Sequence, residues 1–277
     1  MIVVVAVSYF GSKDLGPYLK SLQAQTFEEW NLVVVDNSED DDEWHQIESL
    51  TDGEIRVKVL RADMNLGYFG AVEWALPQVD HPNVTWLVVS NTDVHLANND
   101  TFAELIRVPM EGIGVLAPSI RSAKDGHDQN PYQLRRPTVT QMRIRKMILG
   151  NILLAQIVIL VYAVIHRTFK THNASQHTSA AKFIYAAHGS FFAVSRTFLD
   201  RGGNFDFPMF LFAEELYVAE QARGLALKTL YAPSVKVEHF EHRQTGYLRS
   251  HKILKCGAQA AHYGYALIKA EKAITAP

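Results

Sequence analysis

The sequence contains a single cysteine, Cys256, among its 277 residues. One cysteine excludes an intrachain disulfide framework and a cysteine-based zinc site within one chain, and it is typical of a reducing compartment such as the cytosol. The chain also lacks a basic excess, because 27 lysine and arginine residues face 29 aspartate and glutamate residues. Nucleic-acid-binding proteins usually carry a basic field. We therefore expect no nucleic-acid partner.

Several common enzyme motifs are absent as well. The sequence has no GxxxxGK[ST], no GxGxxG after its first apolar run, no HExxH and no GxSxG. These absences argue against a P-loop ATPase, a dinucleotide oxidoreductase, a zinc protease and a serine hydrolase of those types. No basic leader with a small-residue cleavage site is present at MIVVVAVSYF, so we expect a strand there and not a signal peptide.

Short apolar runs alternate with segments of helical periodicity. The runs are rich in β-branched residues and lie at residues 2–7, 32–35, 55–60, 84–89 and 113–120. This alternation predicts an α/β fold with a mostly parallel central sheet and flanking helices. Polar side chains follow several of these runs, and open parallel sheets bind ligands at the carboxyl ends of their strands. The sequence therefore predicts a site at that edge.

Some polar side chains are candidates for chemistry, and each also has a purely structural explanation. Asp36 directly follows an apolar run, and Asp93 lies just past another, after Ser90-Asn91-Thr92. A carboxylate in such a place serves as a turn former or as a ligand of Mg²⁺ or Mn²⁺. Glu214 and Glu215 begin a predicted helix, where they complement its dipole or act as a general base. His239 ends a later strand and is a candidate metal ligand.

The order of seven blocks resembles the family 2 glycosyltransferases, in particular their rhamnosyltransferase-like branch. The blocks are VVVAVSYFGS, LVVVDNSEDD, NLGYFGA, WLVVSNTDV, HGSFFAVSRTFLDRGGNFD, MFLFAEEL and VKVEHFEH. The resemblance covers roughly residues 1–246, outside the middle of the chain. It implies a GT-A fold, Rossmann-like in its nucleotide-binding part. It also implies an inverting transfer from a nucleoside diphosphate sugar to a glycan or lipid-linked acceptor in cell-surface polysaccharide synthesis.

The resemblance also implies roles for particular residues. The nucleotide-sugar site would include Ser8, Tyr9, Asp36, Asn65, Gly67 and Asn91. A metal, Mg²⁺ or Mn²⁺, would be bound by Asp93 and His239. The pair Glu214 and Glu215 would contain the catalytic base, for which we favour Glu215. His188 and Gly189 would lie on the acceptor side.

On this basis we expect a single glycosyltransferase domain at residues 1–246, followed by a C-terminal helix at 247–277. The domain would comprise a nucleotide-sugar-binding half at 1–120, a basic and apolar helical insert at 121–182, and an acceptor and catalytic half at 183–246.

The sequence departs from the family pattern at several positions. Tyr217-Val218 and Gln221 stand where the family often has Asp-Leu and Arg, and Glu73-Trp74 where it often has Asn. An alternative is therefore a non-catalytic nucleotide-sugar-binding or scaffold subunit on the same fold. A nucleotidyltransferase is a further alternative, but SYFGSKDLG is a poor match to the glycine-rich basic loop of that class.

The longest apolar run, MILGNILLAQIVILVYAVI at residues 147–165, has the length of a transmembrane helix. However, Asp93 precedes it and Glu215 and His239 follow it, so a single crossing would divide the expected site. Basic residues at both ends give no orientation bias. We expect a helix or helix pair here. Residues 135–170 would lie on the anionic inner face of the cell membrane, or the helices of 147–165 would form a homo-oligomer contact. A buried core helix is the alternative.

Overall fold

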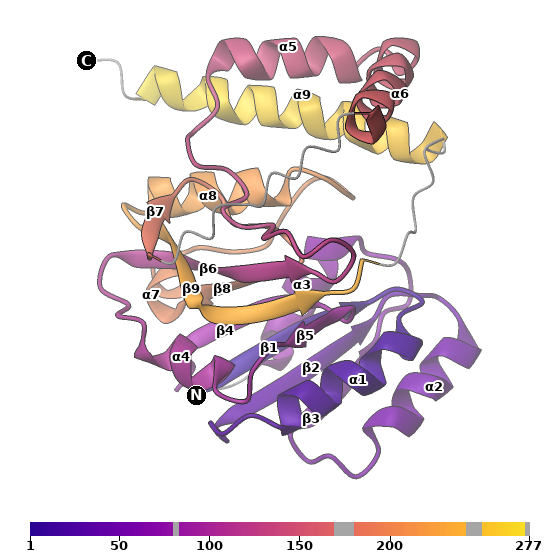
Figure 1. Ribbon diagram of the computed structural model, residues 1–277, viewed down its shortest axis with the longest axis vertical. Helices are drawn as coiled ribbons and strands as arrows, with labels where there is room; N and C mark the ends of the chain where they lie inside the picture. The colour runs from indigo at the N-terminus through magenta and orange to yellow at the C-terminus, as the bar shows by residue number, and fades with distance from the viewer. Residues whose placement is uncertain (80–82, 169–179, 242–250, 275–277) are drawn as a thin grey trace.

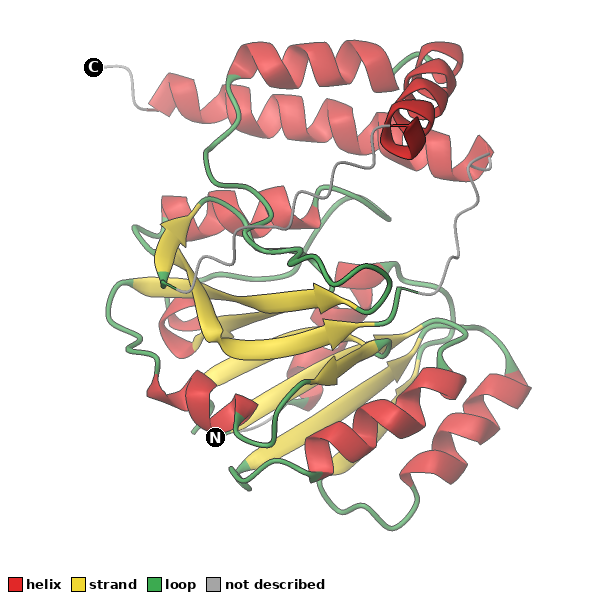
Figure 2. Ribbon diagram, viewed as in Figure 1, coloured by secondary structure: helices red, strands yellow, loops and turns green. Residues whose placement is uncertain are grey.

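The computed structural model describes residues 1–79, 83–168, 180–241 and 251–274, and it has an α/β fold (Figure 1). A central sheet carries helices on both faces, and a further layer of helices lies beyond one of them (Figure 2). The expected fold class is confirmed.

Within the described residues, nine strands form one sheet in the order β3-β2-β1-β4-β8-β6-β9-β5, with β7 paired to β9. The strands are β1 (Ile2–Ser8), β2 (Trp30–Asp36), β3 (Val57–Arg61), β4 (Trp86–Asn91), β5 (Val94–Leu96), β6 (Ile113–Ser122), β7 (Lys182–Ile184), β8 (Phe191–Ser195) and β9 (Lys228–His239). Strands β3, β2, β1 and β4 are parallel neighbours. Strand β8 enters antiparallel between β4 and β6.

The helices of the described chain are α1 (Ser12–Gln23), α2 (Asp41–Thr51), α3 (Tyr68–Ala75), the 3-10 turn η1 (Leu76–Gln78), α4 (Thr101–Arg107), α5 (Val139–Leu149), α6 (Ile152–Thr168), α7 (Arg196–Asp200), α8 (Glu214–Gly224) and α9 (His251–Ile274). Residues 169–179, which follow α6, lie outside the described part of the chain.

Strand β1 is buried along its whole length, which explains its unbroken run of β-branched residues. Successive side chains of a strand point to opposite faces of the sheet. Val4 accordingly packs with Leu15 of α1 in one cluster, whereas Val5 packs with Phe69 of α3 in another. Because apolar layers cover both faces, the only polar part of β1 is its carboxyl end.

Helices α5 and α9 lie side by side above α8, and α6 crosses their end (Figure 1). Met142 of α5, Leu216 of α8 and Ile268 of α9 form one buried cluster. Gly264 permits this close approach, because a Cβ atom there would lie 2.8 Å from both Leu216 Cδ2 and Met142 Cε.

The long apolar run is a helix pair, as one of the sequence expectations allowed. Helix α5 ends at Leu149, and α6 begins after Asn151, whose Oδ1 accepts a hydrogen bond from Leu154 N at 3.0 Å. The alternative of a buried core helix is wrong, since Leu153 is 72% exposed and Ile157 50% exposed. Within the described ranges, no helix is both long and apolar enough to cross a bilayer.

Arg136 corrects part of the expectation that residues 135–170 face lipid. Its guanidinium turns inward and makes two bonds to Glu220, from Nε to Oε1 at 2.8 Å and from Nη2 to Oε2 at 2.6 Å. Tyr185 OH donates to the same carboxylate at 2.7 Å. Glu220 is buried, and a buried carboxylate requires such partners. Arg136 therefore anchors the segment that leads into α5.

We predict that Arg136→Met lowers the free energy of unfolding by about 3 kcal/mol, because it leaves the Glu220 carboxylate buried without its bidentate partner. Urea denaturation at neutral pH measures this change. The matched control is Arg107→Met, which removes an exposed i,i+3 pair with Glu104 and should cost less than about 1 kcal/mol. Equal losses in the two variants would contradict a special role for Arg136.

Candidate active site

The carboxyl ends of β1 and β2 place two polar side chains next to each other. Ser8 is paired with Asp36 in the parallel register, and both residues are buried. Asp36 Oδ1 accepts a hydrogen bond from Ser38 N at 3.0 Å. Within the described chain, Asp36 Oδ2 and Ser8 Oγ are buried without a hydrogen-bond partner. Buried polar atoms are rarely left unsatisfied, so these two atoms keep unused hydrogen-bonding capacity at the edge where the sequence predicts a nucleotide site. Tyr9, the next residue along the chain, is 46% exposed.

A residue that sequence analysis missed, Asn37, holds the loop that contains Asn65 and Gly67. Its Oδ1 accepts from Leu66 N at 2.8 Å, and its Nδ2 donates to Asn65 Oδ1 at 3.0 Å and to Gly67 O at 3.1 Å. Gly67 has φ +75°, and a Cβ atom there would lie 2.4 Å from Phe210 O. Only glycine meets both conditions. The loop therefore lies against the segment that precedes α8.

Asp93, two residues after the end of β4, meets His239, the last residue of β9. His239 Nε2 lies 3.4 Å from Asp93 Oδ1, and Phe240 N donates to Asp93 O at 2.9 Å. Val94 is paired with His239 in the antiparallel ladder between β5 and β9. The short strand β5, which sequence analysis did not predict, thus fixes the position of Asp93 next to His239.

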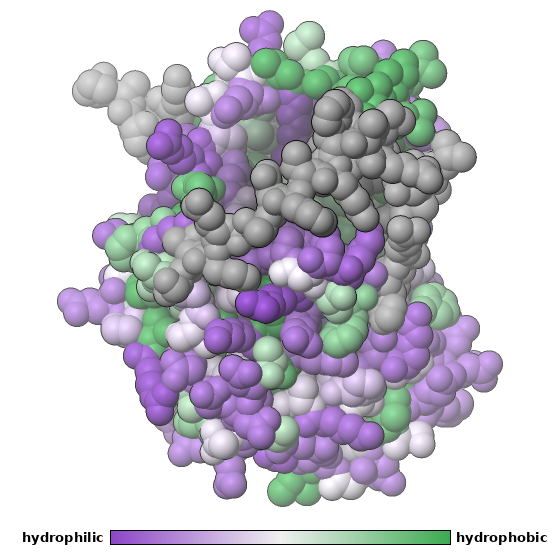
Figure 3. Space-filling model, viewed as in Figure 1, coloured by the Kyte–Doolittle hydropathy of each residue, from purple (hydrophilic) through white to green (hydrophobic). Residues whose placement is uncertain are grey.

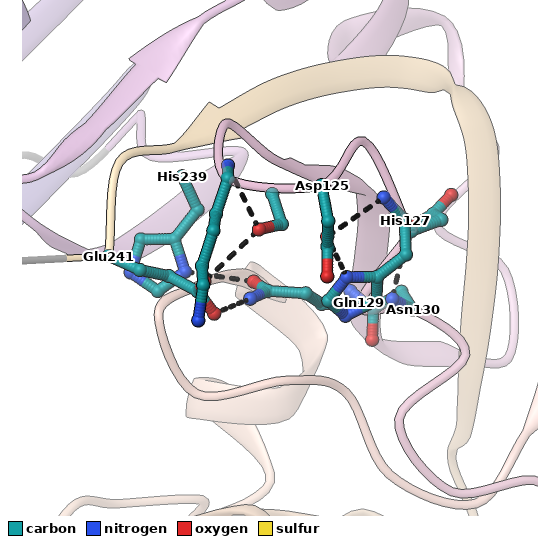
Figure 4. A network of polar contacts seen from close by, with 9 residues as sticks. Asp125, His127, Gln129, Asn130, His239 and Glu241 are labelled. Atoms are coloured by element: carbon teal, nitrogen blue, oxygen red, sulfur yellow. Dashed lines mark hydrogen bonds and ion pairs between the residues drawn. The ribbon is translucent and has the colours of Figure 1, made fainter. Parts of the chain in front are cut away.

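Gln129 determines which nitrogen of His239 carries a proton (Figure 4). Its Nε2 donates to Glu241 Oε1, so its Oε1 faces His239 Nδ1 at 2.8 Å. An amide oxygen only accepts hydrogen bonds, and Nδ1 therefore donates. In the neutral ring this leaves the lone pair of Nε2 directed toward Asp93. A metal-binding histidine typically donates one ring N–H to an oxygen acceptor and binds the metal through the lone pair of its other nitrogen.

Asp93 and His239 fit a divalent cation as a two-residue ligand set. A carboxylate oxygen and an imidazole nitrogen are both acceptable ligands of Mn²⁺, and a carboxylate is the usual protein ligand of Mg²⁺. No group of three or more histidine, cysteine, aspartate or glutamate side chains that could hold a metal ion occurs in the described ranges. A cation here would take its other ligands from a phosphate group or water.

His188 lies next to both His239 and Tyr132. Its ring centroid is 5.9 Å from that of His239 and 5.5 Å from that of Tyr132. Ser190 N donates to His188 Nδ1 at 3.2 Å, which places the proton of the neutral ring on Nε2. Burial and the neighbouring His239 lower the pKa of His188 to about 4. His188 is therefore neutral at physiological pH.

Glu214 and Glu215 begin α8, directly after two non-glycine residues in the left-handed region. Phe212 has φ 73° and Ala213 has φ 72°, a conformation that costs free energy and often occurs at functional sites. Glu214 Oε1 accepts from Phe212 N at 2.9 Å. Glu215 lies against Gly189, because a Cβ atom added at Gly189 would be 3.0 Å from Glu215 Oε1. The backbone at Gly189 thus leaves room for the Glu215 side chain.

A cavity of about 330 Å³ adjoins both carboxylates, with Tyr132 and Arg145 among its other lining residues. Arg145 comes from α5, and sequence analysis assigned it no role in the site. A larger and shallower hollow of about 670 Å³ lies between α1 and α2, and its lining includes none of the predicted site residues. Of these two cavities, the smaller is therefore the one that can hold a bound molecule beside Glu214 and Glu215.

Burial changes the proton affinity of both carboxyl groups. It raises the pKa of Glu214 to about 7, with the nearby charge of Glu215 adding to the effect. Burial also raises the pKa of Glu215, against opposing contributions from backbone hydrogen bonds and the positive charge of Arg145. A carboxylate whose pKa lies closer to neutrality is a stronger base.

Three of the residues that depart from the family pattern, Glu73, Tyr217 and Gln221, converge on one loop. Phe205 N donates to Glu73 Oε2 at 2.8 Å. Tyr217 OH donates to Asn204 Oδ1 at 2.7 Å, and Gln221 Nε2 donates to Asn204 O at 2.8 Å. All three side chains therefore bind residues 204–205.

Comparison with known proteins gives a family match and a set of similar folds. The model of the family described as "Glycosyl transferase family 2" matches residues 2–169. No curated protein sequence matches the chain. A structure of GalNAc-T7 with UDP, GalNAc and Mn²⁺ is similar, with a TM-score of 0.62 and 16% identity over 87% of this chain.

Two further solved structures are also similar. The mannosyltransferase PcManGT from Pyrobaculum calidifontis, in complex with GDP-Man and Mn²⁺, has a TM-score of 0.54 and 14% identity over 100% of this chain. Residues 1–349 of TarS from S. aureus, in complex with UDP-GlcNAc, have a TM-score of 0.57 and 16% identity over 89% of this chain. The chain covers 44%, 76% and 60% of GalNAc-T7, PcManGT and the TarS fragment, respectively. These likenesses show the GT-A fold.

The raised pKa of Glu214 predicts a pH-dependent stability. Between its ordinary value of 4.5 and about 7, folded Glu214 keeps a proton that the unfolded chain has lost. Stability from the neutral group is complete below about pH 4.5 and is lost as the pH rises to about 7. We predict that Glu214→Gln, which keeps an acceptor for Phe212 N, raises the free energy of unfolding at pH 8 by up to about 3 kcal/mol.

Urea denaturation at a series of pH values measures this difference, which should shrink toward zero near pH 4.5. The control is Glu111→Gln at an exposed position, which should show no such trend. A difference between wild type and Glu214→Gln that is constant with pH would contradict the raised pKa.

Proposed function

The chain belongs to glycosyl transferase family 2, and from this premise we propose that it is an inverting, metal-dependent glycosyltransferase. Its donor is a nucleoside diphosphate sugar, and because of the sequence resemblance we favour rhamnose as the sugar that is transferred. Its acceptor is a hydroxyl group of a glycan or lipid-linked glycan in cell-surface polysaccharide synthesis. One observation carries the proposal: the unpartnered atoms of Ser8 and Asp36 share a sheet edge with Asp93.

The donor class is supported by the strand-end polar atoms and by the neighbouring structures. Ser8 Oγ and Asp36 Oδ2 offer a hydroxyl and a carboxylate to the hydroxyl and N–H groups of a ribose or base. Asn37 holds the adjoining loop at Asn65 and Gly67 in one conformation. Among the similar structures, complexes with UDP, GDP-Man and UDP-GlcNAc each contain a nucleotide or nucleotide sugar.

Asp93 and His239 would hold the metal, Mg²⁺ or Mn²⁺. Gln129 supports this role, because it fixes the His239 tautomer with Nε2 toward Asp93. When bound, the cation would neutralise charge on the departing diphosphate.

Glu215 acts as the general base in this proposal. It lies beside Gly189 and the cavity, and burial raises its pKa. Its carboxylate takes the proton of the acceptor hydroxyl, and the oxygen attacks the anomeric carbon. The bond from that carbon to the diphosphate breaks, and the diphosphate leaves with the electron pair. A single displacement inverts the carbon. The positive charge of Arg145 opposes the effect of burial on the pKa of Glu215 and so favours the carboxylate, which is the form that acts as a base.

We predict that Glu215→Gln lowers the rate of sugar transfer by about 100-fold or more, because it removes the proton acceptor. A panel of UDP-, GDP- and dTDP-sugars with Mn²⁺ is first tested by thermal shift, since a ligand of the folded state raises the midpoint. Release of nucleoside diphosphate from the stabilising donor is then measured with a glycan and lipid-linked acceptor panel. The variant should bind the donor as the wild type does.

Two outcomes would reject catalysis by Glu215. Equal release by wild type and Glu215→Gln would assign the base elsewhere. Donor binding without release above background by the wild type, across the whole panel, would favour the non-catalytic binding subunit.

A separate prediction concerns the metal. Asp93→Asn should raise the half-saturating Mn²⁺ concentration for donor binding at least about tenfold, because it replaces an anionic ligand by a neutral one. Titration of Mn²⁺ against the donor-induced thermal shift measures it. Asp52→Asn, at an exposed position, is the control and should leave the titration unchanged. An unchanged titration in Asp93→Asn would remove Asp93 from the metal site.

A further inference from the structure

Helix α6 has an unusual surface for a helix outside the core. Its described side chains are mostly large and apolar, and they are exposed on several sides, whereas Ala155 is buried. A helix that is apolar on all sides is normally covered by protein or lipid. Within the described residues, no other element covers this surface of α6, because Leu153, Ile157 and Val161 each remain at least half exposed.

The apolar surface continues from α6 onto α5. In Figure 3 the hydrophobic residues gather at the top of the molecule, over α5 and α6, while the lower part is mostly hydrophilic. We call this patch the apolar face; its members are Ile144, Met147, Leu153, Ile157, Leu160 and Val161. Contiguous exposed patches of this kind mark interaction sites.

The charge of the same layer indicates what the apolar face binds. Helices α5, α6 and α9 contain eight of the chain's 27 lysine and arginine residues but only one of its 29 aspartate and glutamate residues. The layer is therefore strongly basic in a chain whose net charge is −2. Arg143 lies one helical turn from Met147 on α5, and both are exposed. Cations thus lie directly beside the apolar face.

We propose that the apolar face docks on an anionic lipid surface. Its apolar side chains would enter the boundary between headgroups and acyl chains, and the basic residues around it would contact the headgroups. A second copy of the chain fits less well as the occupant, because two basic layers would be brought face to face, and like charges oppose such an interface.

The docked helix also reaches the cavity. Arg145, on the same helix as Ile144 and Met147, lines the cavity together with Glu214 and Glu215. Docking through α5 therefore places the cavity close to the lipid surface. Binding itself needs neither donor nor metal, so its test is independent of the proposed sugar transfer.

Co-sedimentation with vesicles tests the proposal. The probes are vesicles of phosphatidylcholine alone and of phosphatidylcholine with an equal part of phosphatidylglycerol. We expect the full chain to bind the anionic vesicles and not the neutral ones, with affinity that falls as salt is added. The double variant Leu153→Ser/Ile157→Ser should weaken binding about tenfold or more. So should Arg143→Gln/Lys255→Gln, which removes one exposed charge from α5 and one from α9.

Matched controls separate the apolar face from general effects of composition and charge. Leu50→Ser/Ile55→Ser removes two exposed apolar side chains near α2 and β3, and Lys13→Gln/Lys20→Gln removes two exposed charges from α1. Both should bind as the wild type does. Analytical ultracentrifugation without lipid should give a monomer.

The proposal is overturned if the wild type does not bind anionic vesicles. It is also overturned if the control variants lose as much binding as the α5, α6 and α9 variants. A dimer that Leu153→Ser/Ile157→Ser dissociates, in a protein that binds no vesicles, would assign the apolar face to a second copy.

Discussion

Parallel pairing of β1 with both β2 and β4 is the constraint on which the candidate site depends. The register places Ser8 beside Asp36, and Val7 beside Asn91. All three strands are buried on both faces, so a shift of register would move apolar side chains out of their layers. The polar residues at the carboxyl ends of the three strands, Ser8, Asp36 and Asn91, therefore lie at one edge of the sheet. No contact between those polar side chains is needed to bring them there.

The second half of the chain reaches this edge through backbone hydrogen bonds more than through side-chain attraction. Asn91 N donates to Ser190 O at 2.9 Å, and Phe240 N donates to Asp93 O at 2.9 Å. These bonds hold the segments of His188 and His239 against the end of β4. One side-chain bond adds to them: Tyr68 OH, at the start of α3, donates to Gly189 O at 2.9 Å, which ties α3 to the residue beside Glu215. Backbone bonds of this kind fix positions regardless of the protonation state of the site.

The sequence predicted best those features that depend on local patterns. The apolar runs predicted strands that the structure has within about two residues, such as β1 and β2, because burial on both faces leaves an uninterrupted apolar signal. Gln129, which orients His239 from 110 positions away, gave no signal. Arg136 falls in the range 135–170 that the sequence led us to expect on a membrane surface, although Glu220 binds it across 84 positions. Long-range polar partners are selected by the folded structure and leave no periodic pattern in the sequence.

The departures from the family pattern bear on the choice between an enzyme and a binding subunit. Glu73, Tyr217 and Gln221 each bind residues 204–205. Their polar atoms are engaged there and not with Glu215, whose pKa depends on burial, backbone bonds and Arg145. Because these three departures meet at one loop, a single set of hydrogen bonds to that loop explains all of them. They need not reflect three separate losses of function at Glu214 and Glu215. These hydrogen bonds fix the position of the loop before Phe205. Phe205 itself packs with Phe69 in the core. The departures therefore provide no argument against catalysis by Glu215.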